Sequence, residues 1–220
     1  MNKVDYRLNA IVDGSLRDVG DLADLAAIAA QNGATVIQYR DKDSSTRTMV
    51  AQAVAMRAAL AGSGVPLLIN DRVDVALASG ADGVHLGRDD MEPATARRLL
   101  GKDAIIGLTV KNEADADVAA TADIDYACIG GVFATLSKNN PDAPVGLDGF
   151  AKLRARIAAM QPNLPVGAIA GIDAQRAGEV VQAGASGVAV IASIFRAPDI
   201  AAASRALRQA VDNALTKVQP

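Results

Sequence analysis

The sequence has very few of the residues that usually carry metal, redox or disulfide chemistry. Its 220 residues include one cysteine, Cys128, one histidine, His85, and no tryptophan. A single cysteine excludes an intrachain disulfide or CxxC site, and a single histidine excludes histidine-rich zinc sites. We expect Cys128, in the apolar run YACIGG, to be a small core residue. We expect His85, in the middle of GVHLG, to be packed and hydrogen-bonded rather than to carry protons.

Strong positive charge and long apolar runs are also missing. The formal net charge is −3 and the isoelectric point is about 5.1, so no general basic field recruits nucleic acid or an anionic membrane. No apolar stretch reaches the ~18 residues that span a bilayer, and the segment MNKVDYRLNAIVDG lacks a signal-peptide core. We therefore expect a cytoplasmic protein without nucleic-acid or membrane partners, in which local groups hold any anionic ligand.

What the sequence has in abundance is small aliphatic residues, in short apolar runs that alternate with helix-like segments. Half of the residues are hydrophobic and only 3% are aromatic. Near-continuous apolar runs of this length are typical of parallel strands covered on both faces. The pattern predicts strands at 6–12, 35–40, 66–70, 83–87, 104–110, 126–131, 165–171 and 187–193. It predicts helices at 18–32, 46–62, 72–79, 93–100, 112–121, 148–160, 174–183 and 199–217.

This alternation predicts an α/β fold, a (β/α)₈ TIM barrel that occupies residues 1–220 as a single domain. The alternative is a doubly wound open sheet, but neither the first strand nor the turn after it carries the GxGxxG pattern. The longest irregular segment, 134–149, follows the sixth strand, and a loop of that length is either functional or disordered.

Polar side chains gather where the predicted strands end, which is the active-site face of this fold. Asp71 and Asp90 follow neighbouring strands, so they can share one Mg²⁺, a cation usually held by one or two carboxylates plus substrate phosphates. Taken singly, Asp71 could cap a helix and Asp90 could be a solvated loop acid. Their position at the same end of successive strands favours the metal. The cations and neutral donors expected around a diphosphate are Arg40, Lys42, Lys138, Gln38, Asn70 and Thr109.

A second anion site is predicted across the barrel mouth. Gly171 in AIAGI allows close approach of backbone, and VIASIF offers backbone N–H groups at Ile191 and Ala192. Loops after strands seven and eight frequently bind phosphate in these barrels, although each glycine could be only a turn. A diphosphate site opposite a monophosphate site indicates an enzyme that joins two phosphorylated halves.

Six stretches in order resemble the thiamine-phosphate synthase family over nearly the whole chain: QYRDK, LLINDRVDVALASGADGVHLGRDD, IIGLTV, DYACIGGVFATLSK, AIAGI and GVAVIASI. The resemblance implies that 4-amino-2-methyl-5-hydroxymethylpyrimidine diphosphate and a thiazole phosphate are joined, with Mg²⁺ as cofactor and diphosphate released. It also implies that the C–O bond breaks largely before the new bond forms, without a general base.

The resemblance assigns roles residue by residue. Asp71 and Asp90 would hold Mg²⁺, and the catalytic contacts would come from Arg40, Lys42, Thr109 and Lys138. The pyrimidine diphosphate would bind Gln38, Tyr39, Arg40, Asp41, Lys42, Asn70, Thr109 and Lys138. The thiazole phosphate would bind Thr135, Leu136, Ser137, Gly171, Ile191 and Ala192.

Three departures and two rival functions accompany this assignment. The family commonly has Ser at Thr109, Gly-Pro at Gly130 and Gly131, and Ser at Ala192. One alternative function is that of a metal-independent thiazole tautomerase, but the presence of Asp71, Asp90 and Lys138 argues against it. The other alternative is a non-catalytic barrel that binds thiamine phosphate.

A homodimer is compatible with the sequence, which does not fix the oligomeric state.

Overall fold

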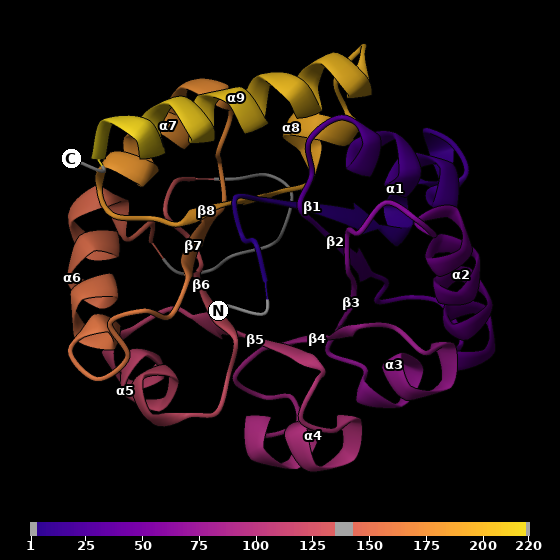
Figure 1. Ribbon diagram of the computed structural model, residues 1–220, viewed down its shortest axis with the longest axis horizontal. Helices are drawn as coiled ribbons and strands as arrows, with labels where there is room; N and C mark the ends of the chain where they lie inside the picture. Colours follow the sequence, from indigo (N-terminus) through magenta and orange to yellow (C-terminus); the bar gives the residue numbers. More distant parts are fainter. Residues whose placement is uncertain (1–3, 135–142, 219–220) are drawn as a thin grey trace.

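The computed structural model describes residues 4–134 and 143–218, in which eight parallel strands close into a barrel in chain order and helices surround it (Figure 1). The predicted TIM barrel is therefore confirmed. The strands are β1 Leu8–Asp13, β2 Val36–Arg40, β3 Leu67–Asn70, β4 Gly83–Leu86, β5 Ile105–Val110, β6 Tyr126–Ile129, β7 Val166–Ile169 and β8 Gly187–Val190.

The helices of the described residues follow the strands and form the outer ring. They are α1 Leu22–Gln31, α2 Thr46–Ala59, α3 Val73–Ser79, α4 Pro93–Leu100, α5 Glu113–Thr121, α6 Gly146–Ala158, α7 Ala174–Gln182, α8 Ala192–Phe195 and α9 Ile200–Val218, with a 3₁₀ turn, η1 Gly14–Asp18, after β1. None of them, within the described ranges, is long and apolar enough to cross a membrane.

Several predicted boundaries differ from the structure by a few residues, and among the strands the largest difference is at β8, which ends at Val190 and not at Ser193. Ile191 has φ −113° and ψ −78°, which takes the chain out of the extended conformation and into the short helix α8. The Ser193 hydroxyl donates a hydrogen bond to the carbonyl of Ile172. This contact ties the start of α8 to the loop after β7.

Alternate strand residues serve two separate apolar clusters. One set, which includes Leu8, Ala10 and Val12, packs between the strands and the helices. The other set fills the barrel interior, where the rings of Tyr6 and Tyr126 stack with centroids 4.4 Å apart. Period-two alternation therefore sends every second side chain of a strand into the lumen.

A repeated polar contact fastens the amino ends of the strands in pairs. The residue before each even-numbered strand accepts a hydrogen bond from a backbone N–H at the start of the preceding odd-numbered strand. The four contacts are Leu8 N–H to Thr35, Leu67 N–H to Asp82, Ile106 N–H to Asp125 and Val166 N–H to Ser186, at 2.8–3.2 Å. This shared role explains why the returns Ala-Asp-Gly at 81–83 and Ala-Ser-Gly at 185–187 are so alike.

Candidate active site

The carboxyl ends of the strands surround a cavity of about 930 Å³. Most of the described residues predicted from the sequence line it together: Gln38, Arg40, Lys42, Asn70, Asp71, Asp90, Thr109, Gly171, Ile191 and Ala192. Thr135, Leu136, Ser137 and Lys138 lie outside the described residues. Strand ends far apart in the chain thus meet at one mouth, as the barrel requires.

The two predicted metal ligands face each other. The carboxyl groups of Asp71 and Asp90 lie close enough to share a hydrogen bond, and the Lys42 ammonium contacts the Asp71 carboxylate. Asp90 also accepts a 2.7 Å hydrogen bond from the N–H of Gly87, which fixes its carboxyl group over the end of β4. The geometry brings two carboxylates and one cation to a single point of the cavity wall.

Asp71 does not cap the helix that follows it. The N-cap residue of α3 is Arg72, without a side-chain capping bond, and Asp71 has φ +64°. Its backbone N–H donates a 2.8 Å hydrogen bond to the carbonyl of His85 on β4. A left-handed conformation is uncommon outside glycine and costs energy, although Asp tolerates it better than most residues. This backbone turns the carboxyl group toward the cavity.

The two carboxyl groups have pKa values displaced in opposite directions. Burial tends to raise the pKa of Asp71, but the hydrogen bonds from Lys42 and Asp90 outweigh it and the net pKa is lowered. Burial and the neighbouring Asp71 raise the pKa of Asp90, and the Gly87 N–H only partly offsets them. Like charges in one site resist joint ionisation, so a cation placed between them would be attracted by both.

The donor set fits Mg²⁺. Within residues 4–134 and 143–218, no group of three or more His, Cys, Asp or Glu side chains forms a metal cage. Two hard carboxylates open to a cavity suit an ion that keeps several waters and takes its remaining ligands from substrate phosphates. Asp71 and Asp90 could together hold such an ion.

The side chains of residues 38–42 alternate between the cavity and the layer of helices around the barrel. Gln38 and Arg40 line the cavity, and Arg40 forms a 2.5 Å ion pair with Asp13. Tyr39 and Asp41 are buried elsewhere: the Tyr39 hydroxyl donates to Asp41, which also accepts a 2.7 Å bond from Arg17. Burial tends to raise the pKa of Asp41, but Arg17 and two backbone N–H groups lower it overall. The structure gives these two residues a bracing role and does not bring them to the cavity wall.

The loops after β6 and β7 have backbone conformations that restrict their side chains. Ala170 and Gly171 have φ +92° and +64°, and a Cβ added at Gly171 would lie 2.4 Å from the carbonyl oxygen of Ala134. Gly131 has φ +70°, which proline cannot adopt because its ring fixes φ near −65°. A proline at position 131 would therefore require a different local backbone.

Several charged residues of the wall are not among those predicted from the sequence, and Lys111 is the clearest of them. Lys111 stands two positions after Thr109 and is exposed, and a Cβ added at Gly130 would contact both side chains at 3.8 Å. Arg88 and Asp115 also line the cavity and pair with each other at 2.9 Å. The period-two alternation of β5 is the signal that could have found Lys111.

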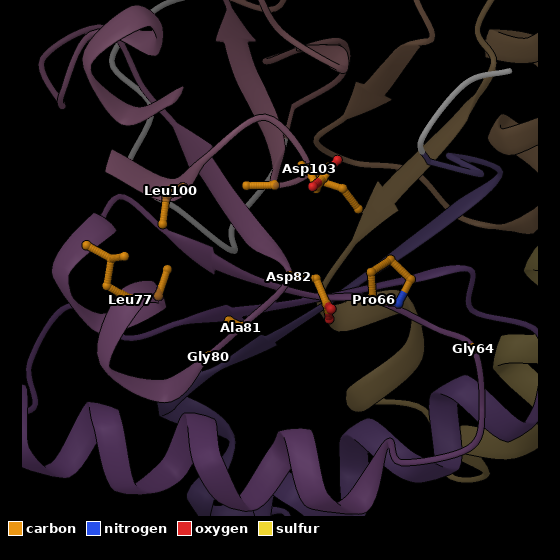
Figure 2. Close-up of a pocket in the computed structure, with 11 residues that line it drawn as sticks. Gly64, Pro66, Leu77, Gly80, Ala81, Asp82, Leu100 and Asp103 are labelled. Carbon is orange, nitrogen blue, oxygen red and sulfur yellow. The ribbon is translucent and has the colours of Figure 1, made fainter. Parts of the chain in front are cut away.

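A second hollow lies at the amino end of the strands and has different contents. Figure 2 shows it between α3, α4 and the start of β3, with Asp82 and Asp103 as its acidic residues. Its volume is about 500 Å³. The Asp82 carboxylate already accepts the N–H of Leu67, and the lining contains no Lys or Arg to hold a phosphate. The converging polar groups are therefore at the mouth.

Comparisons with known proteins place the chain in a family. A sequence model of the thiamine monophosphate synthase family matches residues 8–194. The thiamine-phosphate synthase of Agrobacterium fabrum is 65% identical, and the match covers 100% of both chains. That of Chloroflexus aurantiacus is 42% identical, and the match covers 94% of both chains. The thiamine phosphate pyrophosphorylase of Pyrococcus furiosus superposes with a TM-score of 0.82 at 33% identity, covering 97% of this chain and 98% of that one. An orotidine 5′-phosphate decarboxylase from Pyrococcus horikoshii, at 13% identity and TM-score 0.66, shares the fold alone.

Proposed function

The chain belongs to the thiamine monophosphate synthase family and is a transferase that makes thiamine phosphate, and from this premise we propose how its barrel mouth carries out the reaction. The substrates are hydroxymethylpyrimidine diphosphate and a thiazole phosphate. The C–O bond of the pyrimidine diphosphate breaks and its electron pair leaves with diphosphate. The lone pair of the thiazole nitrogen then forms the new C–N bond.

Stabilisation of the departing diphosphate is the main task of the site, because charge develops there as the C–O bond breaks. The observation that carries the proposal is the pairing of Asp71 and Asp90 beside Lys42 on the cavity wall. Mg²⁺ held by the two carboxylates would supply positive charge to the diphosphate oxygens. Lys42 and Arg40 add fixed cations to the same side of the mouth.

The neutral donors of the wall orient the pyrimidine half. Gln38, Asn70 and Thr109 line the cavity at the carboxyl ends of β2, β3 and β5. No general base is needed, because the thiazole nitrogen is already a nucleophile. This agrees with a chain whose only histidine is hydrogen-bonded between two hydroxyl groups. Holding the two halves in register lowers the entropic part of the barrier.

The thiazole phosphate is assigned to the opposite side of the mouth. Gly171, Ile191 and Ala192 line the cavity at the ends of β7 and β8, where backbone N–H groups can reach an anion. Ala192 offers no hydroxyl, and the neighbouring Ser193 hydroxyl is bonded to the Ile172 carbonyl. The phosphate contacts proposed here therefore come from backbone. A homodimer and a cytoplasmic location stay predictions.

Initial rates with both purified substrates, with Mg²⁺ and with a chelator, test the proposal. We expect one diphosphate released per thiamine phosphate formed, and loss of both products when the metal is removed. Conversion of thiazole phosphate without diphosphate release would indicate a tautomerase. Full turnover in the chelator would refute the metal's role, and binding of thiamine phosphate without turnover would indicate a non-catalytic barrel.

A further inference from the structure

His85 lies in the barrel lumen between two hydroxyl groups from neighbouring strands. Its Nδ1 is 2.9 Å from the hydroxyl oxygen of Tyr126 on β6, and its Nε2 is 2.8 Å from Oγ1 of Thr109 on β5. The imidazole and phenol rings lie 5.5 Å apart and nearly parallel, at 19°. The three side chains form a row that runs from the barrel interior to the cavity wall.

The packing of the lumen fixes the Tyr126 ring. Tyr126 is completely buried and stacks on Tyr6. Gly107 stands beside it, and a Cβ there would lie 2.0 Å from the ring carbon that bears the hydroxyl. Gly167 makes the same room for Tyr6, with a Cβ distance of 1.9 Å. Side chains at these positions would displace the rings, so the Tyr126 hydroxyl has a defined place.

The hydrogen bonds of this row have a preferred direction. Among the described residues, the one hydrogen-bond contact of the Tyr126 hydroxyl is His85 Nδ1. Burial raises the pKa of Tyr126, so its phenol keeps the proton. A buried O–H without an acceptor costs about 1–3 kcal/mol, so in a neutral imidazole the phenol donates and Nδ1 accepts. The ring proton is then on Nε2, which donates to Thr109.

We propose that Tyr126 is a positioning residue: it fixes His85 as the Nε2–H tautomer, and this makes the Thr109 hydroxyl a donor toward the cavity. With its oxygen accepting from His85, the Thr109 hydroxyl has its own proton free for an acceptor atom of the pyrimidine diphosphate. The inference rests on the proposed function only for the identity of that acceptor. No proton is transferred; the row orients one donor before substrate binds.

The tautomer can be measured without substrate, because His85 is the only histidine of the chain. In protein labelled with ¹⁵N-histidine, two-dimensional NMR at a fixed pH of about 8 identifies which ring nitrogen carries hydrogen, well above the usual histidine pKa. We expect Nε2–H in the unsubstituted chain and a mixture of tautomers in Tyr126→Phe. Tyr6→Phe is the matched control, since it removes a second buried phenol hydroxyl, which accepts a hydrogen bond from Asn9. It is expected to leave the tautomer unchanged.

A double-mutant cycle tests whether the row acts through Thr109. Tyr126→Phe should lower kcat/KM for the pyrimidine diphosphate about tenfold, because the hydrogen bond from the Thr109 hydroxyl to this substrate is no longer oriented. The KM for thiazole phosphate should not change. In the Thr109→Val background the same change should have no further effect, whereas in Thr109→Ser the tenfold loss should persist.

Three results would overturn the inference: Nδ1–H or a doubly protonated ring in the unsubstituted chain, an unchanged tautomer in Tyr126→Phe, or an equal kinetic loss with and without the Thr109 hydroxyl. The first requires no variant, so it stays decisive if Tyr126→Phe does not fold. If the chain releases no diphosphate but shows the Nε2–H tautomer, the proposed function is refuted. The proposed direction of the hydrogen bonds from Tyr126 through His85 to Thr109 is still supported in that case.

Discussion

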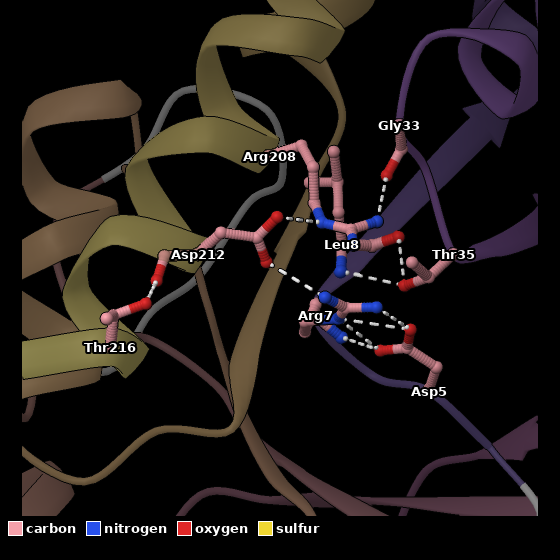
Figure 3. A network of polar contacts seen from close by, with 8 residues as sticks. All are labelled: Asp5, Arg7, Leu8, Gly33, Thr35, Arg208, Asp212 and Thr216. Carbon is pink, nitrogen blue, oxygen red and sulfur yellow. Dashed lines mark hydrogen bonds and ion pairs between the residues drawn. The ribbon is translucent and has the colours of Figure 1, made fainter. Parts of the chain in front are cut away.

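Opposite ends of the same strands use their charged residues in different ways. At the amino end, Asp212 accepts from both Arg7 and Arg208, at 3.1 and 2.8 Å, while Arg7 also holds Asp5 through two nitrogens (Figure 3). At the carboxyl end, Asp71 and Asp90 lie next to each other on the cavity wall. The network at the amino end pairs opposite charges, whereas the mouth, which also has the ion pairs Arg40–Asp13 and Arg88–Asp115, brings two like charges together as well.

Backbone strain is distributed in the same way. Within the described residues, the non-glycine positions with positive φ are Asp71 and Ala170, and both line the cavity. At the amino end, by contrast, backbone N–H groups at the strand starts donate hydrogen bonds to the side chains of Thr35, Asp82, Asp125 and Ser186. The comparison indicates that stability is concentrated at one end of the barrel and reactivity at the other.

The largest effect is expected at the mouth, from Asp71→Asn. Asparagine tolerates the left-handed backbone and keeps the shape, so we expect kcat to fall about 10³-fold, or about 4 kcal/mol, through lost stabilisation of the leaving group. The midpoint of thermal unfolding should change little, because loss of the Lys42 contact is offset by relief of repulsion with Asp90. Steady-state kinetics and calorimetry measure the two quantities. Asp89→Asn, an exposed neighbour, is the control, and an equal loss there would indicate a general charge effect.

At the amino end, Asp125→Ala is expected to have the opposite effect: a loss of stability with little change in kcat. Asp125 and Arg97 are 10% and 11% exposed, and Asp125 also accepts the Ile106 N–H. Its removal should lower the free energy of unfolding by about 2–3 kcal/mol, since it leaves buried donors unpaired. The kcat of the folded enzyme should stay within about twofold. Asp123→Ala, which contacts the same arginine at 74% exposure, should cost under about 0.5 kcal/mol in urea unfolding. Similar costs for the two variants would contradict this account.

A smaller loss of stability is expected from Asp212→Ala in the network of Figure 3. The carboxylate of Asp212 is 39% exposed, so solvent screens its pairs with Arg7 and Arg208. We expect a decrease of about 0.5–1 kcal/mol, diminishing at high salt, and unchanged kinetics. Urea unfolding at two ionic strengths measures it. A change in kcat would show that the two ends of the barrel are coupled.

The smallest effect is expected from Lys111→Gln, which removes an exposed cation from the mouth. The KM for the pyrimidine diphosphate should rise about threefold at low ionic strength and return toward normal at high salt, because exposed charges act at long range. Lys102→Gln, just before the amino end of the same strand, is the control. A salt-independent loss would mean that Lys111 contacts the substrate directly.

The barrel was predictable because its determinants are local and periodic. The apolar runs, separated by segments with helical spacing, predicted all eight strands. Because the strands are parallel, their carboxyl ends lie at the same end of the barrel. The end of β8 was not predictable from local pattern, because the chain turns at Ile191 beside a hydrogen bond from Ser193 to Ile172, a residue of a different loop. Local apolar character continues past the point where the strand stops.

The site was predictable as a set of residue types at strand ends, but individual orientations were not. Asp71 could have capped α3, and only its backbone conformation shows that it does not. Tyr39 and Asp41 share a stretch with Arg40, yet their contacts lie outside the cavity. The partners of His85 come from two other strands, so no local pattern specifies them.

Binding of Mn²⁺ in the presence of inorganic diphosphate tests the central claim that Asp71 and Asp90 hold one divalent cation together. Mn²⁺ prefers the same oxygen ligands as Mg²⁺, and its electron paramagnetic resonance signal separates free from bound ion. We predict one bound ion per chain, with affinity falling at least about tenfold in Asp71→Asn and equally in Asp90→Asn. Unchanged affinity in either variant would contradict the shared site.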